Sequence, residues 1–399
     1  MILPAQADKL IARHLRDFPV ERVALTDASG LVLREDIFAD RDLPAFDKST
    51  MDGIAVCLAS WEHGTRKFVL EGVQPAGQKA PRLKRNDGCF EIMTGAMLPE
   101  GCDCVVPIER VRIENGHAVI ASDAALSRGQ FMVRQAADHK KGERLLAKGI
   151  RMLPPHTAVA ASVGKSRVLV TRKIKVAVIA TGNELVNIAR QKIAPHQIRL
   201  SNSYALLSLL KRAGIFESEL FHIKDDPKAL RSRLNKILKG FDVLVLSGGV
   251  SMGKFDYVPS VLKDLGVRVA FHKIAQRPGK PFWFGTSRKR QPVFALPGNP
   301  VSTLVCAYRY VVPHLLRAAG VKVLHPDSAA LAKTLRVAPP LVKFLPVKFD
   351  PRTQGAVRAV GYSGSGDYVS LAQADGFVEL LPGRTYRQNE RVKFFRWTI

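Results

Sequence analysis

The sequence has few cysteines and no long hydrophobic run, and both shortages narrow the possible locations of the protein. No window offers the roughly 18 uncharged apolar residues that a membrane span needs. The first residues mix acidic and basic side chains and contain no apolar core, unlike a secretion signal. Five cysteines, an odd number, fit a reducing compartment better than a disulfide framework. We therefore expect a cytoplasmic protein without membrane segments.

Acidic residues are also scarce. The chain has 35 Asp and Glu against 61 Lys and Arg, a net charge of +26. Such an excess attracts polyanions whatever the fold, and nucleic acid is one candidate. However, the basic residues are scattered, with short clusters at 79–85, 140–151 and 288–290 and no basic module rich in aromatic residues. A generally basic surface is the preferred interpretation, and nucleic-acid binding is the less favoured alternative.

The length of 399 residues, with 46% hydrophobic residues, predicts two to four packed domains. Residues 173–322 alternate apolar strands with helices, which predicts a doubly wound parallel α/β domain. Residues 41–138 contain short β-type runs between Gly, Pro and Asn turns, which is typical of an inserted β-rich domain. Residues 1–40 and 139–172 are expected to form an N-terminal helical or extended domain, with helical patterns at 5–17 and 142–162. Residues 323–399 are expected to form a C-terminal β-barrel-like domain.

Three predicted strands of the α/β domain end in glycine-containing turns. The turns are Thr181-Gly182 after strand 175–180, Ser247-Gly248-Gly249 after strand 243–246, and Pro297-Gly298 after strand 293–296. Glycines after strands are common, and a purely structural turn is the alternative interpretation of each. Ligands of open parallel sheets bind beyond the carboxyl ends of the strands. Three such ends in one domain therefore predict an active site at one edge of the sheet.

Two further features predict an anionic ligand. Arg277 and Lys280 bring two cations close to the third strand. Asn299 is typical of an N-cap and Pro300 of a first helical position, which predicts a helix over 300–319. The free N–H groups of such a helix favour anions. A second helix is expected over 201–213, capped by Ser201 or Asn202. A phosphate-bearing or oxyanionic ligand fits this combination.

The remaining polar segments have less specific signals. A polar loop at 42–52 carries carboxylates and hydroxyls, and an ordinary surface loop is the alternative interpretation. Cys102-Asp103-Cys104 has metal-binding residue types, but without a second Cys/His pair a structural role is preferred. The segment Ser363-Gly364-Ser365-Gly366 is interpreted as a plain linker.

Six motifs together resemble a known family. They are FDKSTMDGIAV at 46–56, IMTGAMLP at 92–99, ATGNEL at 180–185, LSGGVSMGKFDY at 246–257, RPGKP at 277–281 and LPGNPVS at 296–302. Their order and combination resemble the molybdopterin molybdenumtransferases, the MoeA family that includes the gephyrin E domain. The C-terminal quarter is similar only in its β texture and a Gly-Ser-Gly loop.

The resemblance implies a MogA-like α/β domain and a reaction. Molybdenum from molybdate is inserted into adenylated molybdopterin, AMP is released, and Mg²⁺ is the cofactor. The resemblance also implies an elongated cytoplasmic homodimer, with the cleft between the α/β domain of one chain and the β-rich parts of its partner. A MogA-type adenylyltransferase and molybdoenzyme maturation proteins are further expected partners.

The same resemblance gives the expected site residues. Mg²⁺ prefers carboxylate and phosphate oxygens, and its expected ligands are Glu184, Asp225 and Asp256. These three residues, with Asp52, Thr94 and Asp138, form the expected catalytic set. Cationic side chains are expected to neutralise a pyrophosphate and a nearby oxyanion. The expected binding residues are Thr181, Gly182, Asn202, Ser247, Gly248, Gly249, Ser251, Lys273, Arg277, Lys280, Pro297, Gly298, Asn299, Pro300 and Ser365.

The chain departs from the family pattern at several positions. Asn183 and Leu200 stand where the family usually has acidic residues, and Arg277 stands where Lys is commoner. Ala136-Ala137 replaces the usual Gly-Glu before the acidic residue. The two missing carboxylates motivate a second hypothesis, a catalytically weak paralogue that binds molybdopterin or acts as a scaffold. A third hypothesis, the sibling adenylyltransferase, is disfavoured by the Gly-Gly-Val-Ser sequence and the large flanking domains.

Overall fold

A computed structural model describes residues 1–250, 256–322, 326–353, 355–361 and 363–398. The chain divides into two compact units. Unit 1 comprises Met1–Glu35, Lys148–Thr157 and Arg167–Ile399, and unit 2 comprises Asp36–Ala147 and Ala158–Ser166. None of the helices in the described part of the chain is long and apolar enough to cross a membrane.

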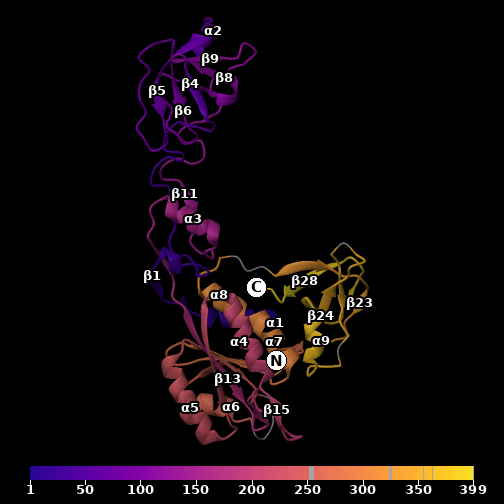
Figure 1. Ribbon diagram of the computed structural model, residues 1–399. Helices are drawn as coiled ribbons and strands as arrows, with labels where there is room; N and C mark the ends of the chain where they lie inside the picture. Colours follow the sequence, from indigo (N-terminus) through magenta and orange to yellow (C-terminus); the bar gives the residue numbers. More distant parts are fainter. Residues whose placement is uncertain (251–255, 323–325, 354, 362, 399) are drawn as a thin grey trace. The chain divides into compact units, whose positions relative to one another are not determined.

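Unit 1 is built on a six-stranded sheet (Figure 1). Its strands, in spatial order, are β16 (Phe216–Ile223), β13 (Ile174–Thr181), β17 (Val243–Ser247), β21 (Pro292–Leu296), β20 (Trp283–Thr286) and β18 (Arg268–His272). The first four are parallel, as predicted, but β20 and β18 are antiparallel to their neighbours. The expectation of a wholly parallel sheet is therefore wrong at this edge. The reason is connection length, because β20 and β21 are joined by the short turn 287–291 and a parallel pair needs a long crossover.

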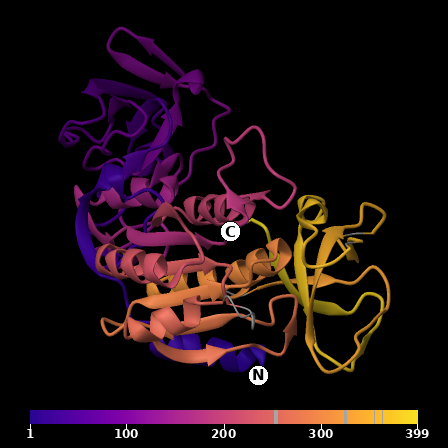
Figure 2. The same cartoon turned by 90° about the horizontal axis from the view of Figure 1, so that it is seen from below.

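Helices cover both faces of this sheet. On one face, α5 (Pro227–Gly240) and α6 (Val258–Asp264) pack their apolar residues against alternate residues of β13, β17 and β21. On the other face lie α4 (Ser201–Ala213) and α7 (Pro300–Cys306), which contact β13 and β21 respectively. The N-terminal helix α1 (Pro4–His14) lies against the edge strand β18 (Figure 2). The core therefore has the doubly wound arrangement that the sequence predicts.

The helix predicted over 300–319 is continuous but irregular. It consists of α7, a π-helical turn η3 (Ala307–Val311) and α8 (Val312–Ala318). Pro313 has no N–H to donate to the preceding turn, which disrupts the regular ladder there. The π-helical turn contains Arg309 and Tyr310, both buried.

The C-terminal part of unit 1 is a second sheet. Its strand order is β19 (Gln276–Arg277), β24 (Val342–Phe349), β26 (Gly376–Leu380), β28 (Arg391–Arg396) and β22 (Asp327–Ala330), with β25 (Val357–Ala359) also paired to β24. The strands β23 (Leu335–Arg336) and β27 (Thr385–Tyr386) form a separate pair, and α9 (Tyr368–Ala372) lies between β25 and β26 in the chain. The residues after β22 close this sheet on itself, because Leu331 bridges Val357 of β25 and the N–H of Ala332 donates to the carbonyl of Val357 at 2.9 Å, which agrees with the expected barrel-like domain. The strand β19 comes from the α/β segment and pairs in parallel with β24, which joins the two sheets.

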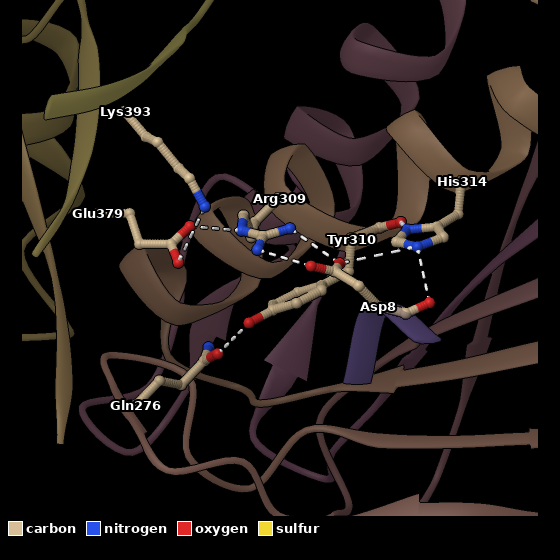
Figure 3. Close-up of polar contacts among 7 residues, drawn as sticks. All are labelled: Asp8, Gln276, Arg309, Tyr310, His314, Glu379 and Lys393. Carbon is tan, nitrogen blue, oxygen red and sulfur yellow. Dashed lines mark hydrogen bonds and ion pairs between the residues drawn. The ribbon is translucent and has the colours of Figure 1, made fainter. Parts of the chain in front are cut away.

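A buried polar cluster also joins the parts of unit 1 (Figure 3). The guanidinium of Arg309 donates two hydrogen bonds to Asp8 of α1, at 2.9 and 2.8 Å, and one to Glu379 of β26, at 3.0 Å. Arg309 is 8% exposed. Burial alone lowers the pKa of this guanidinium, but the bond to Asp8 and the attraction of Glu379 raise it overall. We call Asp8, Arg309 and Glu379 the clasp.

Unit 2 contains a six-stranded sheet of its own. The strand order is β7 (Cys104–Pro107), β4 (Gly53–Val56), β6 (Gly88–Ile92), β5 (Lys67–Gln74), β9 (His117–Ile120) and β8 (Val111–Glu114). The short pairs are β3 (Lys48–Ser49) with β10 (Met132–Val133) and β2 (Ile37–Phe38) with β11 (Arg144–Leu146), and the short helices are α2 (Leu58–Glu62) and η2 (Ile108–Arg110). No metal-binding group of His, Cys, Asp or Glu occurs among the described residues. Cys102 and Cys104 are buried in this unit.

The connecting segments differ from one expectation. Only α3 (Pro154–Ser162) is helical within 142–162, because Arg144–Leu146 pairs with Ile37–Phe38 as β11. In unit 1, β1 (Val20–Ala24) pairs with β12 (Arg167–Thr171). The short helix η1 (Leu25–Asp27) follows β1 in the chain. The strands β14 (Leu185–Val186) and β15 (Ile198–Arg199) form a small parallel pair after β13.

Candidate active site

The ends of β13, β17 and β21 lie side by side, as the sequence predicts. Ala180 pairs with Ser247, and Ser247 pairs with Leu296, so the three glycine-containing turns leave the sheet at one edge. A cavity of about 560 Å³, here called the strand-end cavity, opens there. Its lining includes Thr181, Glu184, Leu200, Ser201, Asn202, Ser247, Gly248, Gly298, Asn299, Pro300 and Tyr368. Most of the binding residues expected at these turns therefore lie around one cavity.

The turn after β17 requires glycine. Gly248 and Gly249 have φ angles of +98° and +67°, which L-residues with side chains rarely adopt. A Cβ on Gly248 would lie 2.6 Å from the carbonyl oxygen of Thr181. The turn after β17 consequently approaches the turn after β13 so closely that no side chain fits at position 248.

Substitution at two glycines tests this packing. We expect Gly248→Ala to cost about 1–3 kcal/mol of stability, because it combines backbone strain with the clash at Thr181. Gly298→Ala is the matched control, since its Cβ meets only the Cα of Gly248, at 3.6 Å. The measurement is the urea midpoint of unfolding of both variants. Equal midpoints would show that the close approach does not constrain the turn.

Asn202 links the strand ends rather than capping its helix. Its side-chain amide donates to the hydroxyl of Ser247 at 3.1 Å and to the carbonyl of Gly298 at 2.7 Å. The N-cap of α4 is Leu200, without a side-chain hydrogen bond, so the expected cap at Ser201 or Asn202 is wrong. Leu200 is 4% exposed, and at this position the cavity wall has an apolar side chain instead of a carboxylate.

Two buried threonine hydroxyl groups lie next to the strand ends. Thr303, which sequence reasoning missed, donates to the carbonyl of Pro297 at 2.6 Å from its buried side chain. Thr181 is 3% exposed, and its buried hydroxyl has no hydrogen-bond partner in the described part of the chain. Buried hydroxyls are normally paired.

Glu184 lines this cavity, and Asp225, which is not a lining residue, interacts electrostatically with Glu184 and Asp256; we call these three carboxylates the acidic side of the cavity. Burial raises the pKa of Asp225, and repulsion from Glu184 and Asp256 raises it further. The backbone N–H of Asp225 donates to the side-chain oxygen of Asn183 at 3.2 Å, so Asn183 supports the neighbouring loop in place of a carboxylate. The three expected magnesium ligands do not form a preformed metal-binding group among the described residues. Their mutual repulsion is nevertheless of the kind that a cation relieves.

A second cavity of about 770 Å³ lies beside the first and is lined by cations; we call it the basic cavity. The expected residues Arg277 and Lys280 line it, and Lys343 of β24 adds a third cation that the sequence did not indicate. Other lining residues are Pro297, Asn299, Ser302, Ser363, Gly364 and Ser365. Lys273, an expected binding residue, lines neither cavity among the described residues, and its backbone pairs with Ile2 and Phe282.

The loop at 363–366 is part of this cavity wall rather than a plain linker. Ser365 accepts a hydrogen bond from the side chain of Asn299 at 2.8 Å, and its carbonyl accepts from the N–H of Val301 at 3.0 Å. Asn299 is the N-cap position of α7, as predicted, but its side chain does not cap the helix. One N–H at this helix start is therefore used within the protein and is not free for an anion.

Asp367 holds the same loop and provides a pH test. Its carboxylate accepts hydrogen bonds from Ser370 and from the backbone of Ser363, which lower the pKa of Asp367 to about 2. A carboxyl with a lowered folded-state pKa stabilises the fold above its unfolded value of about 3.9, and this contribution is lost as the pH falls towards 2. We expect Asp367→Asn to lose less stability than the wild type between pH 5 and pH 2.5, measured by urea unfolding. A parallel loss in both proteins would contradict this role.

In unit 2, two of the three expected residues contact each other. Asp52 accepts hydrogen bonds from the hydroxyl of Thr94 at 2.7 Å and from its backbone N–H at 2.6 Å, and these bonds lower the pKa of Asp52. Asp138 lies in the same unit, where its backbone N–H donates to the carbonyl of Leu43.

Two expected site residues of unit 1 remain. Ser251 lies outside the described residues, and Asp256 is half-buried just before α6.

Three family profiles match successive parts of the chain. They are the MoeA N-terminal region (domain I and II) at residues 3–164, a probable molybdopterin binding domain at 177–317 and the MoeA C-terminal region (domain IV) at 328–397. The molybdopterin molybdenumtransferase of a Synechocystis strain is 36% identical over 401 residues and covers 100% of both chains. The chain belongs to the MoeA family of molybdopterin molybdenumtransferases. The resemblance found in the six motifs is thereby confirmed.

Other relatives agree with this membership. The molybdopterin molybdenumtransferase of Bacillus subtilis is 33% identical over 391 residues, covering 95% of this chain and 90% of its own. Two crystal structures of molybdopterin biosynthesis MoeA proteins of Pyrococcus horikoshii superpose with TM-scores of 0.83 and 0.82, at 31% and 25% identity. The first covers 100% of this chain and 99% of its own, and the second 99% of each. The multidomain α/β fold with a β-rich C-terminal domain is therefore the fold of MoeA proteins.

Proposed function

We propose that this protein inserts molybdenum from molybdate into adenylated molybdopterin and releases AMP. The observation that carries the proposal is the pair of adjoining cavities. The strand-end cavity is walled by three family motifs, and the basic cavity beside it is lined by Arg277, Lys280 and Lys343. Asn299 lines both. A site that joins two oxyanionic reactants needs this kind of arrangement.

The residues suit the two reactants in different ways. The strand-end cavity is lined by Ser201, by the glycine turns at Gly248 and Gly298, and by Thr181, whose hydroxyl has no partner among the described residues; these groups suit phosphate oxygens. The basic cavity offers charge neutralisation for the molybdate dianion. We assign the pyrophosphate of the substrate to the strand-end cavity and molybdate to the basic cavity. Holding both reactants at fixed positions converts a bimolecular reaction into an effectively unimolecular one.

Mg²⁺ fits the acidic side of the strand-end cavity as a shared ion. Mg²⁺ commonly uses one or two carboxylates together with substrate phosphates, so it does not require a complete protein cage. Glu184, Asp225 and Asp256 are the residues that would hold it. When bound, it would neutralise charge on the phosphate that leaves with AMP. Asn202 keeps the turns at Ser247 and Gly298 in place around the same phosphate.

Incubation with adenylated molybdopterin, molybdate and Mg²⁺ tests the proposal directly. We expect stoichiometric release of AMP together with active molybdenum cofactor, measured by chromatography and by reconstitution of an apo-molybdoenzyme. Absence of both products from folded protein would refute it. Tungstate in place of molybdate defines the selectivity of the basic cavity.

A non-catalytic binding or scaffold function is the second candidate. It is favoured by one observation, the apolar Leu200 and the amide Asn183 at positions where the family usually has carboxylates. Tight binding of molybdopterin without AMP release would select it. Nothing in the two cavities favours the adenylyltransferase, and consumption of ATP with free molybdopterin would revive that hypothesis.

The assembly is also a proposal. We propose a cytoplasmic homodimer in which Asp52, Thr94 and Asp138 of one chain complete the site of the other. Five unpaired cysteines are consistent with a reducing compartment. Mixing an Asp52→Asn chain with an Asp256→Ala chain tests complementation, because one intact site forms in the mixed dimer. Sedimentation as a monomer would contradict the proposal.

A further inference from the structure

His222 lies beside the strand ends without lining either cavity. It is the penultimate residue of β16, and its backbone is paired in register with Ala180 of β13. Its ring Nε2 lies 3.0 Å from the carbonyl oxygen of Gly182, in the turn that follows β13. A carbonyl oxygen can only accept, so this ring nitrogen carries the proton and donates. Because the described linings of the strand-end and basic cavities do not include His222, any effect of the ring on the reaction passes through this turn.

The carbonyl that His222 binds also closes a four-residue turn. The N–H of Leu185 approaches the same oxygen of Gly182 at 3.4 Å, which is longer than the usual range of about 2.7–3.2 Å. The ring of His222 therefore makes the shorter of these two contacts. Glu184 lies within the turn, and its backbone carbonyl accepts the N–H of Ile198 at 2.9 Å. The backbone around Glu184 is thus held at two points, and His222 provides one of them.

The side chain of Glu184 depends on the backbone that His222 holds. A Cβ built on Gly182 would lie 2.7 Å from a carboxylate oxygen of Glu184, so this carboxylate lies directly against the Gly182 backbone. The peptide group between Gly182 and Asn183 is planar, and fixing its carbonyl fixes the direction in which the chain continues. The hydrogen bond from His222 therefore orients the segment that carries Glu184.

A second contact joins the same turn to the loop after β16. The side-chain oxygen of Asn183 accepts the backbone N–H of Asp225 at 3.2 Å. Asp225 follows His222 by three residues, so both contacts bridge the same two segments of the chain. One segment carries Glu184 and the other carries Asp225. We call the two contacts the ties, and together they set the separation of these two carboxylates.

The two carboxylates favour separation when no cation lies near them. Repulsion between like charges disfavours their ionised forms, and the chain lowers its energy by moving them apart. Mg²⁺, in contrast, demands near-ideal octahedral geometry with oxygen ligands at about 2.0–2.1 Å. Ligands are held within such tolerances by residues that do not touch the ion themselves. The ties act in this way because they oppose the outward movement of the carboxylates.

We propose that His222 is a positioning residue: it holds the turn of Glu184 against the loop of Asp225, so that both carboxylates act on one divalent cation. This inference rests on the proposed function. It also gives a use to the departure at position 183, because the amide of Asn183 keeps the second tie without adding another negative charge.

Binding of Mn²⁺ tests the positioning role without the reaction. The probe is Mn²⁺ itself, titrated into the full chain at pH 8 and followed by the electron paramagnetic resonance signal of the free ion. We expect His222→Leu to weaken binding about five- to tenfold, the equivalent of one lost hydrogen bond. Asn183→Ala removes the second tie and should have a similar effect. His222→Gln keeps a side-chain N–H donor and is always neutral, so its affinity should lie between those of His222→Leu and the wild type.

A distant histidine provides the matched control. His117 in unit 2 also contacts a backbone carbonyl through its ring, that of Asn115 at 2.9 Å, and His117→Leu should bind Mn²⁺ like the wild type. Because His222 is exposed, the urea midpoint of His222→Leu should stay close to that of the wild type. A smaller folded fraction would reduce the number of sites and leave their affinity unchanged, which distinguishes misfolding from displaced carboxylates.

The kinetic parameters give a second measurement. In the insertion reaction we expect His222→Leu to lower kcat about tenfold with little change in KM for adenylated molybdopterin, because the ring lines neither cavity. Wild-type Mn²⁺ affinity in His222→Leu, or equal losses in His222→Leu and His222→Gln, would overturn the proposal. So would a wild type that binds no Mn²⁺.

The outcomes separate this inference from the proposed function. If Mn²⁺ affinity follows the expected order but the wild type releases no AMP, the proposed function fails and the positioning role stands. If the wild type and His222→Leu insert molybdenum at the same rate and bind Mn²⁺ equally, the positioning role fails and the function stands.

Discussion

Replacing Arg309 with methionine is expected to lower the stability of unit 1 by about 3–5 kcal/mol, the cost of removing one partner from a buried ion pair. The side chain of Glu379 is 7% exposed, and without Arg309 its nearest cation is Lys393 at 4.0 Å. The variant also leaves Asp8 without its bidentate partner. Among the described residues, the buried Glu379 would then keep only this distant cation, and the partly exposed Asp8 would keep only His314, at 3.7 Å. The measurement is the urea midpoint of unfolding.

Two further variants show whether the loss arises from the unpaired charge. Arg396→Met breaks the ion pair with Asp327, in which both side chains are about half exposed, and it should change stability by less than about 1 kcal/mol. The double variant Arg309→Met/Glu379→Leu removes the buried charge as well and should recover part of the loss. An unchanged midpoint for Arg309→Met would show that the clasp does not hold the N-terminal helix and the C-terminal sheet together.

The clasp is connected to the basic cavity through the second sheet. The basic cavity combines Arg277 and Lys280 with Lys343 and Ser365, which belong to the second sheet. Glu379 lies on β26, hydrogen-bonded neighbour of the strand that carries Lys343. Loosening the clasp is therefore expected to disturb the position of β24, and with it Lys343, before unit 1 unfolds. We expect Arg309→Met to weaken molybdate binding in the fraction that remains folded.

Local patterns were sufficient to predict the strand ends but not the contacts between distant segments. The turns at 181, 247 and 297 follow apolar runs, and parallel strands bring their carboxyl ends to one edge, so the convergence follows from the sequence. The clasp joins residues 301 positions apart, Asp8 and Arg309, and no local signal marks such a pair. Lys343 reaches the basic cavity only because β19 pairs with β24. Sequence reasoning had no access to that pairing.

Other errors have local physical causes. An apolar run such as Trp283–Phe284 has the same pattern in a parallel or an antiparallel strand, so strand direction was not encoded in its composition. Asn202 has a good capping side chain, yet the N-cap is Leu200 and the amide group of Asn202 donates to Ser247 and Gly298. A residue type that often caps helices can instead hydrogen-bond to neighbouring turns. The preference for Ser363–Gly366 as a linker failed in the same way, because Ser365 docks on Asn299.

Replacing Asp225 with asparagine is expected to separate activity from stability. Turnover should fall about 100- to 1000-fold, the usual effect of removing one group that stabilises charge in the transition state. Stability should not fall, because the substitution removes a charge whose burial, together with repulsion from Glu184 and Asp256, raises the pKa of Asp225. The variant should also need more Mg²⁺ for half-maximal rate. Steady-state AMP release and urea unfolding measure the two effects.

The neighbouring carboxylate gives the opposite pattern and serves as the control. Asp226 caps α5 by accepting the N–H of Ala229 at 2.7 Å, so Asp226→Ala should cost about 1 kcal/mol of stability and leave turnover unchanged. Two adjacent acidic residues would thus act on different properties, one on the reaction and one on the helix. If Asp225→Asn turned over at the wild-type rate, or if both variants lost activity equally, the acidic side of the strand-end cavity would have no specific part in the reaction.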